Sequence, residues 1–491
     1  MDDLGLVSGT ALARLIRART ITSRDAVEHH IAAIERVNPT LNAVVATRFD
    51  EARAEADAAD ALVLTSAPET LPPFHGVPCT IKESFALRGM PNTAGMVPRR
   101  GRTADVDAIT VTRVRRAGAI PLGVTNVSEA CMWMESNNYV YGRTNNPYDA
   151  SRIVGGSSGG EAAIVGAGAS PFGLGSDIGG SIRGPAFFNG VFGHKPSGGL
   201  VPSTGQHPVT PEKARRFICT GPIARRAEDL MPILRVIAGP DGVDPGCTPI
   251  DLAPTDSVSL RDLTVLHVAD DGRLGVSDEL RAAHERAASA LSARGARVRT
   301  ARFPELAHQF EIWSAMLGSA EEVPFAVLLG EGKRVPPVRE IGKWALRRSD
   351  HTLMALMLAL VDPVTRAFPR ATARWIERGK RLGREIEEAI GPSGVMLYPV
   401  YPTTAPRHYA PVLDYLRLRF PSGFQGVFNV LELPATAVPL GLDRAGLPLG
   451  VQVIGRHGAD HLTIATALAL EDALGGWVRP RENRQGAGNA K

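Results

Sequence analysis

Residues 155–200 are dense in glycine and poor in charge, and no other stretch of the 491-residue chain restricts its fold as strongly. Flexible linkers also contain much glycine, but this stretch includes short apolar runs, such as Ala-Ala-Ile-Val at 162–165, that are typical of buried segments. Glycine allows turns with φ > 0 and lets two backbones approach closely. We therefore expect tight turns inside a packed core, and any chemistry of the chain should be concentrated there.

The composition is that of a globular protein and excludes several functions. Hydrophobic residues make up 44% of the chain and charged residues 22%, which is enough for a large buried core. The net charge of +4 includes no long basic block, so nucleic acid is not an expected partner. The four cysteines, at 79, 131, 219 and 247, form no CxxC pair. We therefore expect no disulfide framework and no zinc site, and we place the protein in the reducing cytoplasm.

Membrane segments are not expected either. The amino terminus is acidic and lacks the positive and apolar regions of a secretory signal. The longest apolar run, residues 353–361, is far shorter than the roughly 20 residues that a membrane-spanning helix needs, so no transmembrane anchor is predicted. The segment 344–360 is apolar after a basic start, and we expect a helix of the core or of a homodimer interface rather than one that docks on lipid.

Strand and helix patterns alternate along the chain and predict an α/β fold. A helix is expected over 23–37, with Ser23 as its cap and Pro39 beyond its end. Strands are expected within 72–82, ending on Lys82, and at 120–124, 264–268, 297–303, 395–399 and 450–454, with helices between them. No linker divides this pattern, so we predict one domain over residues 1–480 and a polar, disordered tail at 481–491.

The glycine-rich stretch partly matches three known motifs. Residues 155–160 begin like a P-loop, but Glu161 and Ala162 replace its lysine and hydroxyl residue, which excludes an ATPase. Residues 166–171 begin like a dinucleotide fingerprint, but proline replaces the third glycine, which excludes NAD; no cofactor is therefore expected. The pattern G-x-S-x-G occurs at Ser157 and Ser158, although only Ile153–Val154 precedes it where an α/β-hydrolase needs a strand. An esterase of that class stays open as an alternative.

Lys82 is the strongest candidate for a general base. Lysine is scarce beside arginine in this chain, and Lys82 ends a short apolar strand. A lysine buried among such residues would have a lowered pKa, so that its neutral amine could accept a proton near neutral pH, which arginine cannot do. The alternative is an ordinary lysine at the end of a strand that extends to solvent.

The segment 177–185 is a candidate site for an oxyanion. Its sequence, Asp-Ile-Gly-Gly-Ser-Ile-Arg-Gly-Pro, places Ser181 after two glycines and before an expected helix with Pro185 in its first turn. The backbone N–H groups of residues 178–181 could converge on the oxyanion of a tetrahedral intermediate. The alternative is an ordinary glycine loop that caps a helix.

Taken together, these segments resemble the amidase signature family. The resemblance rests on Gly-Gly-Ser-Ser-Gly-Gly-Glu at 155–161, Gly-Ser-Asp-Ile-Gly-Gly-Ser-Ile-Arg at 175–183 and Gly-His-Lys-Pro at 193–196. Upstream, Gly-Val-Pro-Cys-Thr-Ile-Lys-Glu at 76–83 is similar to the family's catalytic-lysine segment, and the resemblance extends from about residue 5 to Pro480. Segments 131–136, 141–149 and 185–196 are most like the fatty-acid amide hydrolases of the second vertebrate type and their bacterial relatives.

The resemblance implies a fold and a set of site residues. The fold is a large mixed, twisted β-sheet covered by helices on both faces. The site is a Ser-cisSer-Lys triad, in which Ser181 is the nucleophile, Ser157 the bridging serine and Lys82 the base. The remaining implied residues are the oxyanion-hole amides of Ile178, Gly179, Gly180 and Ser181, the supporting residues Ser158, Asp177 and Arg183, and Met132 in the acyl pocket.

The resemblance also implies the reaction. A carboxamide of a fatty, aliphatic or aryl acid would be cleaved to the acid and ammonia or an amine through an acyl-Ser181 intermediate, without a cofactor. An amidotransferase A-type subunit, which releases ammonia from glutamine for a tRNA-dependent partner, stays open as an alternative. A binding protein without activity is disfavoured, because all three proposed catalytic residues are present and a buried amine is costly to keep without a role. His457 and His461 have metal-like spacing, but Asp460 is expected to cap a helix between them, so no metal is expected.

Overall fold

The computed structural model describes residues 4–481, without the side chains of 363–367. The polar tail predicted for 481–491 therefore lies almost wholly outside the described residues. The strands are β1 (Val44–Thr47), β2 (Pro78–Lys82), β3 (Ile120–Thr125), β4 (Asn137–Asn138), β5 (Gly142–Arg143), β6 (Phe172–Asp177), β7 (Phe192–Lys195), β8 (Cys219–Ala224), β9 (Thr264–His267), β10 (Arg297–Thr300), β11 (Gly394–Tyr398), β12 (Ala435–Leu442) and β13 (Pro448–Ile454).

The helices occupy most of the remaining chain. They are α1 (Gly9–Arg17), α2 (Ser23–Leu41), α3 (Phe49–Thr65), α4 (Ile109–Arg116), α5 (Gly159–Gly166), α6 (Arg183–Phe188), α7 (Leu230–Ile237), α8 (Asp278–Ala293), α9 (Gln309–Ala320), α10 (Phe325–Leu329), α11 (Pro337–Ala345), α12 (Leu353–Ala367), α13 (Pro369–Ile390), α14 (Ala410–Leu416), α15 (Gly423–Val430) and α16 (Asp460–Leu474). Within the described part, no helix is long and apolar enough to cross a bilayer.

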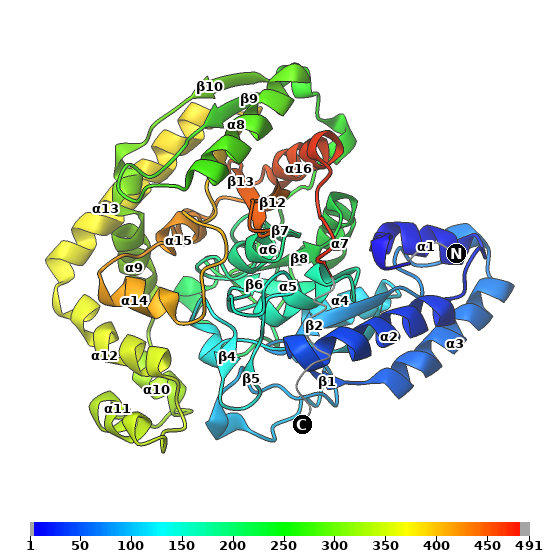
Figure 1. Cartoon of the computed structure of the whole chain (residues 1–491), viewed down its shortest axis with the longest axis horizontal. Coiled ribbons are helices and arrows are strands. Elements are labelled where there is room, and N and C mark those ends of the chain that lie inside the picture. Colours follow the sequence, from blue (N-terminus) through cyan, green and yellow to red (C-terminus); the bar gives the residue numbers. More distant parts are fainter. Residues whose placement is uncertain (1–3, 482–491) are drawn as a thin grey trace.

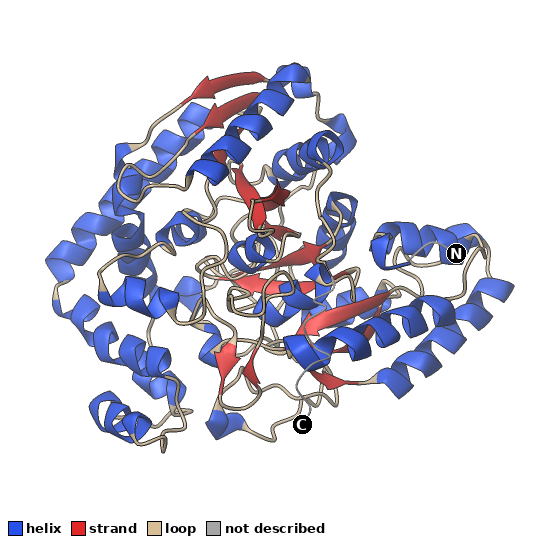
Figure 2. Ribbon diagram, in the orientation of Figure 1, coloured by secondary structure: helices blue, strands red, loops and turns tan. Residues whose placement is uncertain are grey.

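One sheet forms the centre of the molecule. Its 11 strands lie in the order β1-β3-β2-β6-β8-β7-β12-β13-β11-β9-β10. Strand β2 is parallel to both β3 and β6, whereas β8 is antiparallel to β6 and to β7, so the sheet is mixed. It runs as a twisted band from β1 to β10 with helices on both sides (Figures 1 and 2). The predicted α/β fold class is thereby confirmed. Strands from Val44 to Ile454 share this sheet, and the single domain over residues 1–480 stays a prediction.

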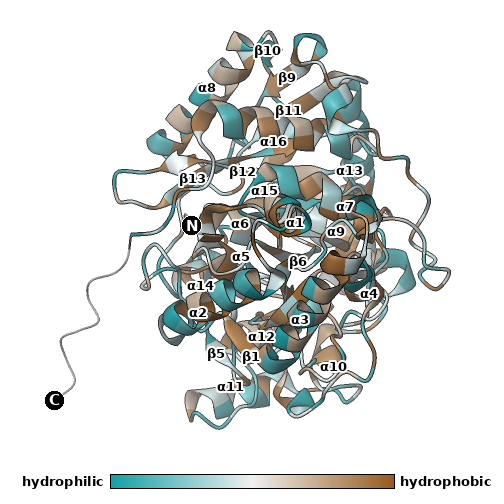
Figure 3. Ribbon diagram, turned by 90° about the vertical axis from the view of Figure 1, so that its right-hand side faces the viewer, coloured by the Kyte–Doolittle hydropathy of each residue, from teal (hydrophilic) through white to brown (hydrophobic). Residues whose placement is uncertain are grey.

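Burial follows this layering. The strands of the glycine-rich stretch and their neighbours, β6, β7 and β8, are buried along their whole length. Hydrophobic colours run through the central elements in Figure 3, whereas outer helices such as α8 carry hydrophilic residues on their exposed sides. The predicted interior position of residues 155–200 is correct, since nearly all of them are buried.

Two sequence-based expectations about helices are wrong. Thr22, not Ser23, caps α2, because its side chain accepts the Asp25 N–H, and the helix continues through Pro39 to Leu41. Pro39 lies in the last turn, where its missing N–H removes a single intrahelical bond. The segment 344–360 is not one helix, since α11 ends at Ala345 and α12 begins at Leu353 with Thr352 as its cap.

Candidate active site

The strand topology brings the predicted site residues together. Strands β2 and β6 are parallel neighbours, and they end at Lys82 and Asp177 respectively. The carboxyl ends of parallel strands meet at the same edge of a sheet. Lys82 therefore lies beside the loop 178–181 that follows β6, and the segment before α5 brings Ser157 to the same place.

Lys82 is buried within a compact set of hydrogen bonds. Its side chain has no solvent exposure, and Nζ lies 2.7 Å from Ser157 Oγ, 2.9 Å from Ser176 Oγ and 3.4 Å from the Ser176 carbonyl oxygen. Burial lowers the pKa of Lys82 from its ordinary value of 10.5, and nearby acidic groups offset only part of that effect. A neutral amine can donate its two N–H groups to the two Ser176 oxygens, which directs its lone pair at Ser157.

Ser157 follows a cis peptide bond. The bond between Gly156 and Ser157 is cis, as the resemblance implied for the bridging serine. A Cβ at Gly156 would lie 2.2 Å from the Trp133 carbonyl oxygen, so only glycine fits there. Ser158 is the N-cap residue of α5, and its hydroxyl contacts the backbone of Ser176 rather than the cavity.

These contacts do not fit the α/β-hydrolase interpretation. The residues directly before Ser157, 144–156, form no strand. Within residues 4–481, no histidine ring is hydrogen-bonded to Ser157 or Ser158, whereas Lys82 contacts Ser157 directly. A nucleophile elbow needs both the strand and the histidine.

The loop 178–181 exposes three of the four expected amides. The N–H groups of Ile178, Gly179 and Ser181 have no acceptor among the described residues, so they are available to an oxyanion. The Gly180 N–H donates to Asp177 Oδ1 at 2.6 Å, which corrects the expectation for Gly180. Gly180 has φ +112°, and a Cβ there would lie 1.9 Å from Gln425 Oε1. Its role is therefore conformational, since it turns the chain so that its neighbours face the cavity.

Asp177 and Arg183 hold this loop in place. Arg183 donates from Nη2 and Nε to the Asp177 carboxylate at 3.0 and 3.1 Å, and both side chains are fully buried. Burial alone would raise the pKa of Asp177, but the Arg183 charge and the hydrogen bonds outweigh it and hold that pKa well below its usual value. Asn429 joins the network, because it accepts from Arg183 at 2.6 Å and donates to the Asp177 carbonyl at 2.8 Å. The sequence analysis assigned Asp177 and Arg183 as supporting residues, and that role stays a prediction.

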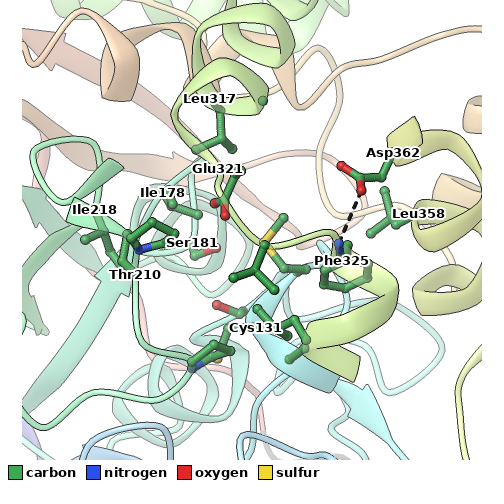
Figure 4. A pocket seen from close by; sticks show the side chains of 18 of the residues that line it. Cys131, Ile178, Ser181, Thr210, Ile218, Leu317, Glu321, Phe325, Leu358 and Asp362 are labelled. Carbon is green, nitrogen blue, oxygen red and sulfur yellow. Dashed lines mark hydrogen bonds between the residues drawn. The ribbon is translucent and has the colours of Figure 1, made fainter. Parts of the chain in front are cut away.

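A cavity opens in front of Ser181. It has a volume of about 180 Å³, and Ser157, Ser176 and Ser181 line it. Figure 4 shows Ser181 beside Ile178 in this cavity. A second cavity of about 100 Å³ shares Ser181 and Met132 with the first. Much of the remaining lining is apolar and comes from α9, α10, α12, α14 and the segment 208–211, including Phe310, Trp313, Leu317, Leu358 and Tyr415. Met132 thus lies where the sequence analysis placed it.

Two further predictions concern residues outside the cavity. Asp460 does not cap α16, whose N-cap is Ala459. Its carboxylate instead accepts from the Ser197 N–H at 2.9 Å and contacts His194 Nε2 at 3.1 Å, which ties α16 to β7. Among the residues that the structure describes, no three histidine, cysteine or acidic side chains gather in a way that could hold a metal ion.

Comparison with known proteins decides the family. The amidase family matches residues 25–464, which is most of the chain. The chain belongs to the amidase family. This amidase is 45% identical to fatty-acid amide hydrolase 2-A of Danio rerio and 43% identical to fatty-acid amide hydrolase 2 of Homo sapiens, in both cases over 98% of this chain and 91% of the relative. The solved structure of 6-aminohexanoate cyclic dimer hydrolase with its substrate is 28% identical, has a TM-score of 0.80 and covers 98% of this chain and 99% of that one.

The amidase site also contains residues that the sequence analysis missed. Ser176 and Gln206 join the wall that carries Ser157, and Cys131 lines both cavities. Trp313 donates from Nε1 to the Ile178 carbonyl oxygen at 3.0 Å, which fixes the start of the oxyanion loop. Ser176 precedes Asp177 within the matched motif and could have been identified from the sequence. Gln206 and Trp313 lie in segments without any recognisable pattern.

Proposed function

We propose that this amidase hydrolyses amides of long-chain fatty acids, with Ser181 as the nucleophile. The contact that carries the mechanism is the 2.7 Å hydrogen bond between the buried Lys82 amine and Ser157. The apolar lining in front of Ser181 and the similarity to fatty-acid amide hydrolases 2 support the choice of acyl group. The product pair is a fatty acid and ammonia or an amine.

Acylation begins with two proton transfers. Neutral Lys82 accepts the Ser157 proton while Ser157 accepts that of Ser181, and Ser181 Oγ forms a bond to the amide carbonyl carbon. Catalytic hydrogen bonds often tighten only when substrate is bound, so we expect the Ser181 hydroxyl to approach Ser157 at that stage. The N–H groups of Ile178, Gly179 and Ser181 stabilise the oxyanion, and each such donor contributes about 3–4 kcal/mol.

The leaving group then needs a proton. Protonated Lys82 returns its proton through Ser157 to the amide nitrogen, the C–N bond breaks, and ammonia or an amine departs. Water attacks acyl-Ser181 while Ser157 and Lys82 again accept a proton. That proton returns through Ser157 to Ser181 Oγ as the bond between Oγ and the acyl carbon breaks, and the fatty acid leaves. Lys82 ends neutral, as it began.

A fluorophosphonate tests the nucleophile. We expect intact-mass and peptide analysis to find one phosphonyl group on Ser181, and we expect Ser181→Ala to lose the label and to lower amide turnover by about 10⁴-fold or more. Ser158→Ala is the matched control, since Ser158 does not face the cavity, and it should keep the label on Ser181. A label on Ser157 or Ser158, or unchanged amide turnover in Lys82→Ala, would overturn the mechanism.

A series of primary amides from acetamide to oleamide tests the acyl group. Each additional buried methylene contributes about 0.8 kcal/mol, so kcat/KM should rise about fourfold per methylene until the cavity is full. The fastest hydrolysis at acetamide would reject the long-chain proposal. Faster hydrolysis of glutamine than of any acyl amide would favour the amidotransferase alternative.

We also propose a cytoplasmic location, which is supported by four free cysteine thiols, three of them buried. A homodimer and peripheral membrane contact stay predictions, and sedimentation analysis and vesicle co-sedimentation would test them.

A further inference from the structure

Gln206 has an unpaired acceptor on the wall of the cavity that carries Ser157. Its side chain is 94% buried, because only 6% of its surface is exposed, and it lines the same cavity as Ser157, Ser176 and Ser181. Its Nε2 donates to Ser176 Oγ at 3.2 Å. Its Oε1 is buried and has no hydrogen-bond partner among the described residues. A buried oxygen without a donor is costly, which is unusual unless a ligand supplies the donor.

The backbone holds Gln206 firmly in this position. The carbonyl oxygen of Gly205 accepts the Ala86 N–H at 3.0 Å, and the His207 N–H donates to the Ser84 carbonyl at 2.8 Å. Both contacts reach the segment directly after β2, which carries Lys82. Gly205 has φ +87°, and a Cβ there would lie 2.5 Å from Ala108 Cα, so the turn requires glycine. Gln206 is thus fixed relative to Lys82 before any substrate binds.

A chain of hydrogen bonds places Gln206 on the leaving-group side. Gln206 Nε2 contacts Ser176 Oγ, Ser176 Oγ contacts Lys82 Nζ, and Lys82 Nζ contacts Ser157 Oγ. In the proposed function, on which this inference rests, Ser157 delivers the proton to the departing nitrogen. That nitrogen must therefore lie on the same wall as Gln206.

We propose that Gln206 Oε1 accepts the N–H of the scissile amide and so selects amides that carry at least one N–H. In the tetrahedral intermediate the nitrogen is pyramidal, with one lone pair that must face Ser157. A hydrogen bond from its N–H to Gln206 turns that lone pair toward the Ser157 hydroxyl. Esters and N,N-disubstituted amides have no such hydrogen, so Gln206 gives them no corresponding stabilisation.

Gln206→Met tests this role, since methionine keeps the length of the side chain but has no amide. The substrates are decanoyl 4-nitroanilide, its N-methyl derivative and 4-nitrophenyl decanoate. We expect kcat/KM for the anilide to fall about tenfold, the value of one hydrogen bond that is made in the transition state. For the N-methyl anilide and the ester we expect less than a twofold change. The proposal would be overturned if kcat/KM fell equally for the two anilides, or if kcat/KM for decanoyl 4-nitroanilide did not change.

Ser176→Ala separates this role from an indirect effect through Lys82. Ser176 contacts Lys82 directly, so its loss should lower turnover of both anilides, because both leaving groups need a proton. If Gln206 acted only through Ser176 and Lys82, Gln206→Met would show that same pattern and would also shift the pH profile of anilide turnover. The rate of Ser181 phosphonylation should stay within twofold of wild type in Gln206→Met. If the fluorophosphonate did not label Ser181 in the wild type, the proposed nucleophile would be wrong, which is a different failure from that of the Gln206 proposal.

Discussion

At the scale of single residues, Lys82 is held in a state that opposes folding. At neutral pH the unfolded chain carries a protonated lysine, whereas burial lowers the pKa of Lys82 in the folded protein. We therefore expect Lys82→Met to lose amide turnover and to raise the free energy of unfolding by about 1 kcal/mol or more. Differential scanning calorimetry measures the change, and Lys213→Met, at a 70% exposed side chain, should leave stability within about 0.5 kcal/mol.

The pH dependence of this effect has a definite sign. Between the lowered folded pKa of Lys82 and its ordinary value of 10.5, the unfolded chain binds one more proton than the folded chain. The contribution of Lys82 to the free energy of unfolding therefore rises with pH in that window. The difference in free energy of unfolding between wild type and Lys82→Met should shrink as pH approaches 10.5. A difference that stays constant with pH would contradict the assignment of a neutral amine.

Candidate residues could be inferred from the sequence where chemistry and chain position coincide. Lys82 was identifiable because a lysine at the end of an apolar strand is unusual, and Ser181 because glycines precede it. Gly180 was assigned as an oxyanion donor in error, since the side chain of Asp177, three residues earlier, accepts its N–H. Gln206 could not be found, because only the folded chain places it beside Ser176.

At the scale of elements, α5 meets β2 and β3 through one buried carboxyl group. Glu161 on α5 accepts hydrogen bonds from Thr80 on β2 and from Thr125 on β3, the latter at 2.9 Å. Burial raises the pKa of Glu161 to about 7 from 4.5. A raised folded pKa means that the group stabilises the fold below its unfolded pKa and loses that contribution as pH rises through the folded value.

Glu161→Gln should remove this dependence. We expect the free energy of unfolding of the wild type to fall by up to about 3 kcal/mol between pH 5 and pH 9 relative to that of the glutamine variant. The reason is that each pKa unit corresponds to about 1.36 kcal/mol. Urea unfolding at both pH values measures the difference. Glu388→Gln, at an exposed position of α13, is the control and should have the same free energy of unfolding as the wild type at both pH values. Equal slopes for wild type and Glu161→Gln would show that Glu161 does not titrate in this range.

Element boundaries were harder to infer than element types. The strand that ends at Lys82 and the helices on either side of it were predictable from periodicity. The break between α11 and α12 was missed, although the polar residues 347–352 lie in it and the last of them, Thr352, caps α12. Asp460 was assigned as a cap from its position before α16, but the nearby Ser197 on the β7 side offers its N–H and captures the carboxylate.

At the scale of the whole molecule, the site is assembled from segments that are far apart in sequence. The proposed triad and oxyanion loop lie between residues 82 and 181, and the sequence motifs cover them. The apolar walls come from α9, α10, α12, α14 and the segment 208–211, and the sequence gives no pattern that places them over Ser181. The order of the strands in the sheet could not be predicted from the sequence either, since β7 pairs with β12, which lies more than 200 residues away in the chain. The reaction class was thus predictable, whereas the shape of the pocket was not.

The helices α10, α11 and α12 lie at the rim of the molecule, away from the sheet (Figure 1). They share a small hydrophobic cluster that is separate from the main core and consists largely of alanines. Little apolar area is buried there, so this region should open locally at a lower free energy than the sheet. In hydrogen exchange, we expect peptides from 325–361 to exchange at least about tenfold faster than those from β6 and β8.

Occupation of the cavity should change that difference, because Leu358 and Val361 of α12 line it. A fluorophosphonate with a long alkyl chain, once bound to Ser181, would contact α12 and should slow exchange in 353–361 by several-fold. A methyl fluorophosphonate, which forms the same bond but leaves the cavity empty, is the matched control and should leave exchange unchanged. Equal protection by both reagents would mean that the acyl chain does not extend along α12.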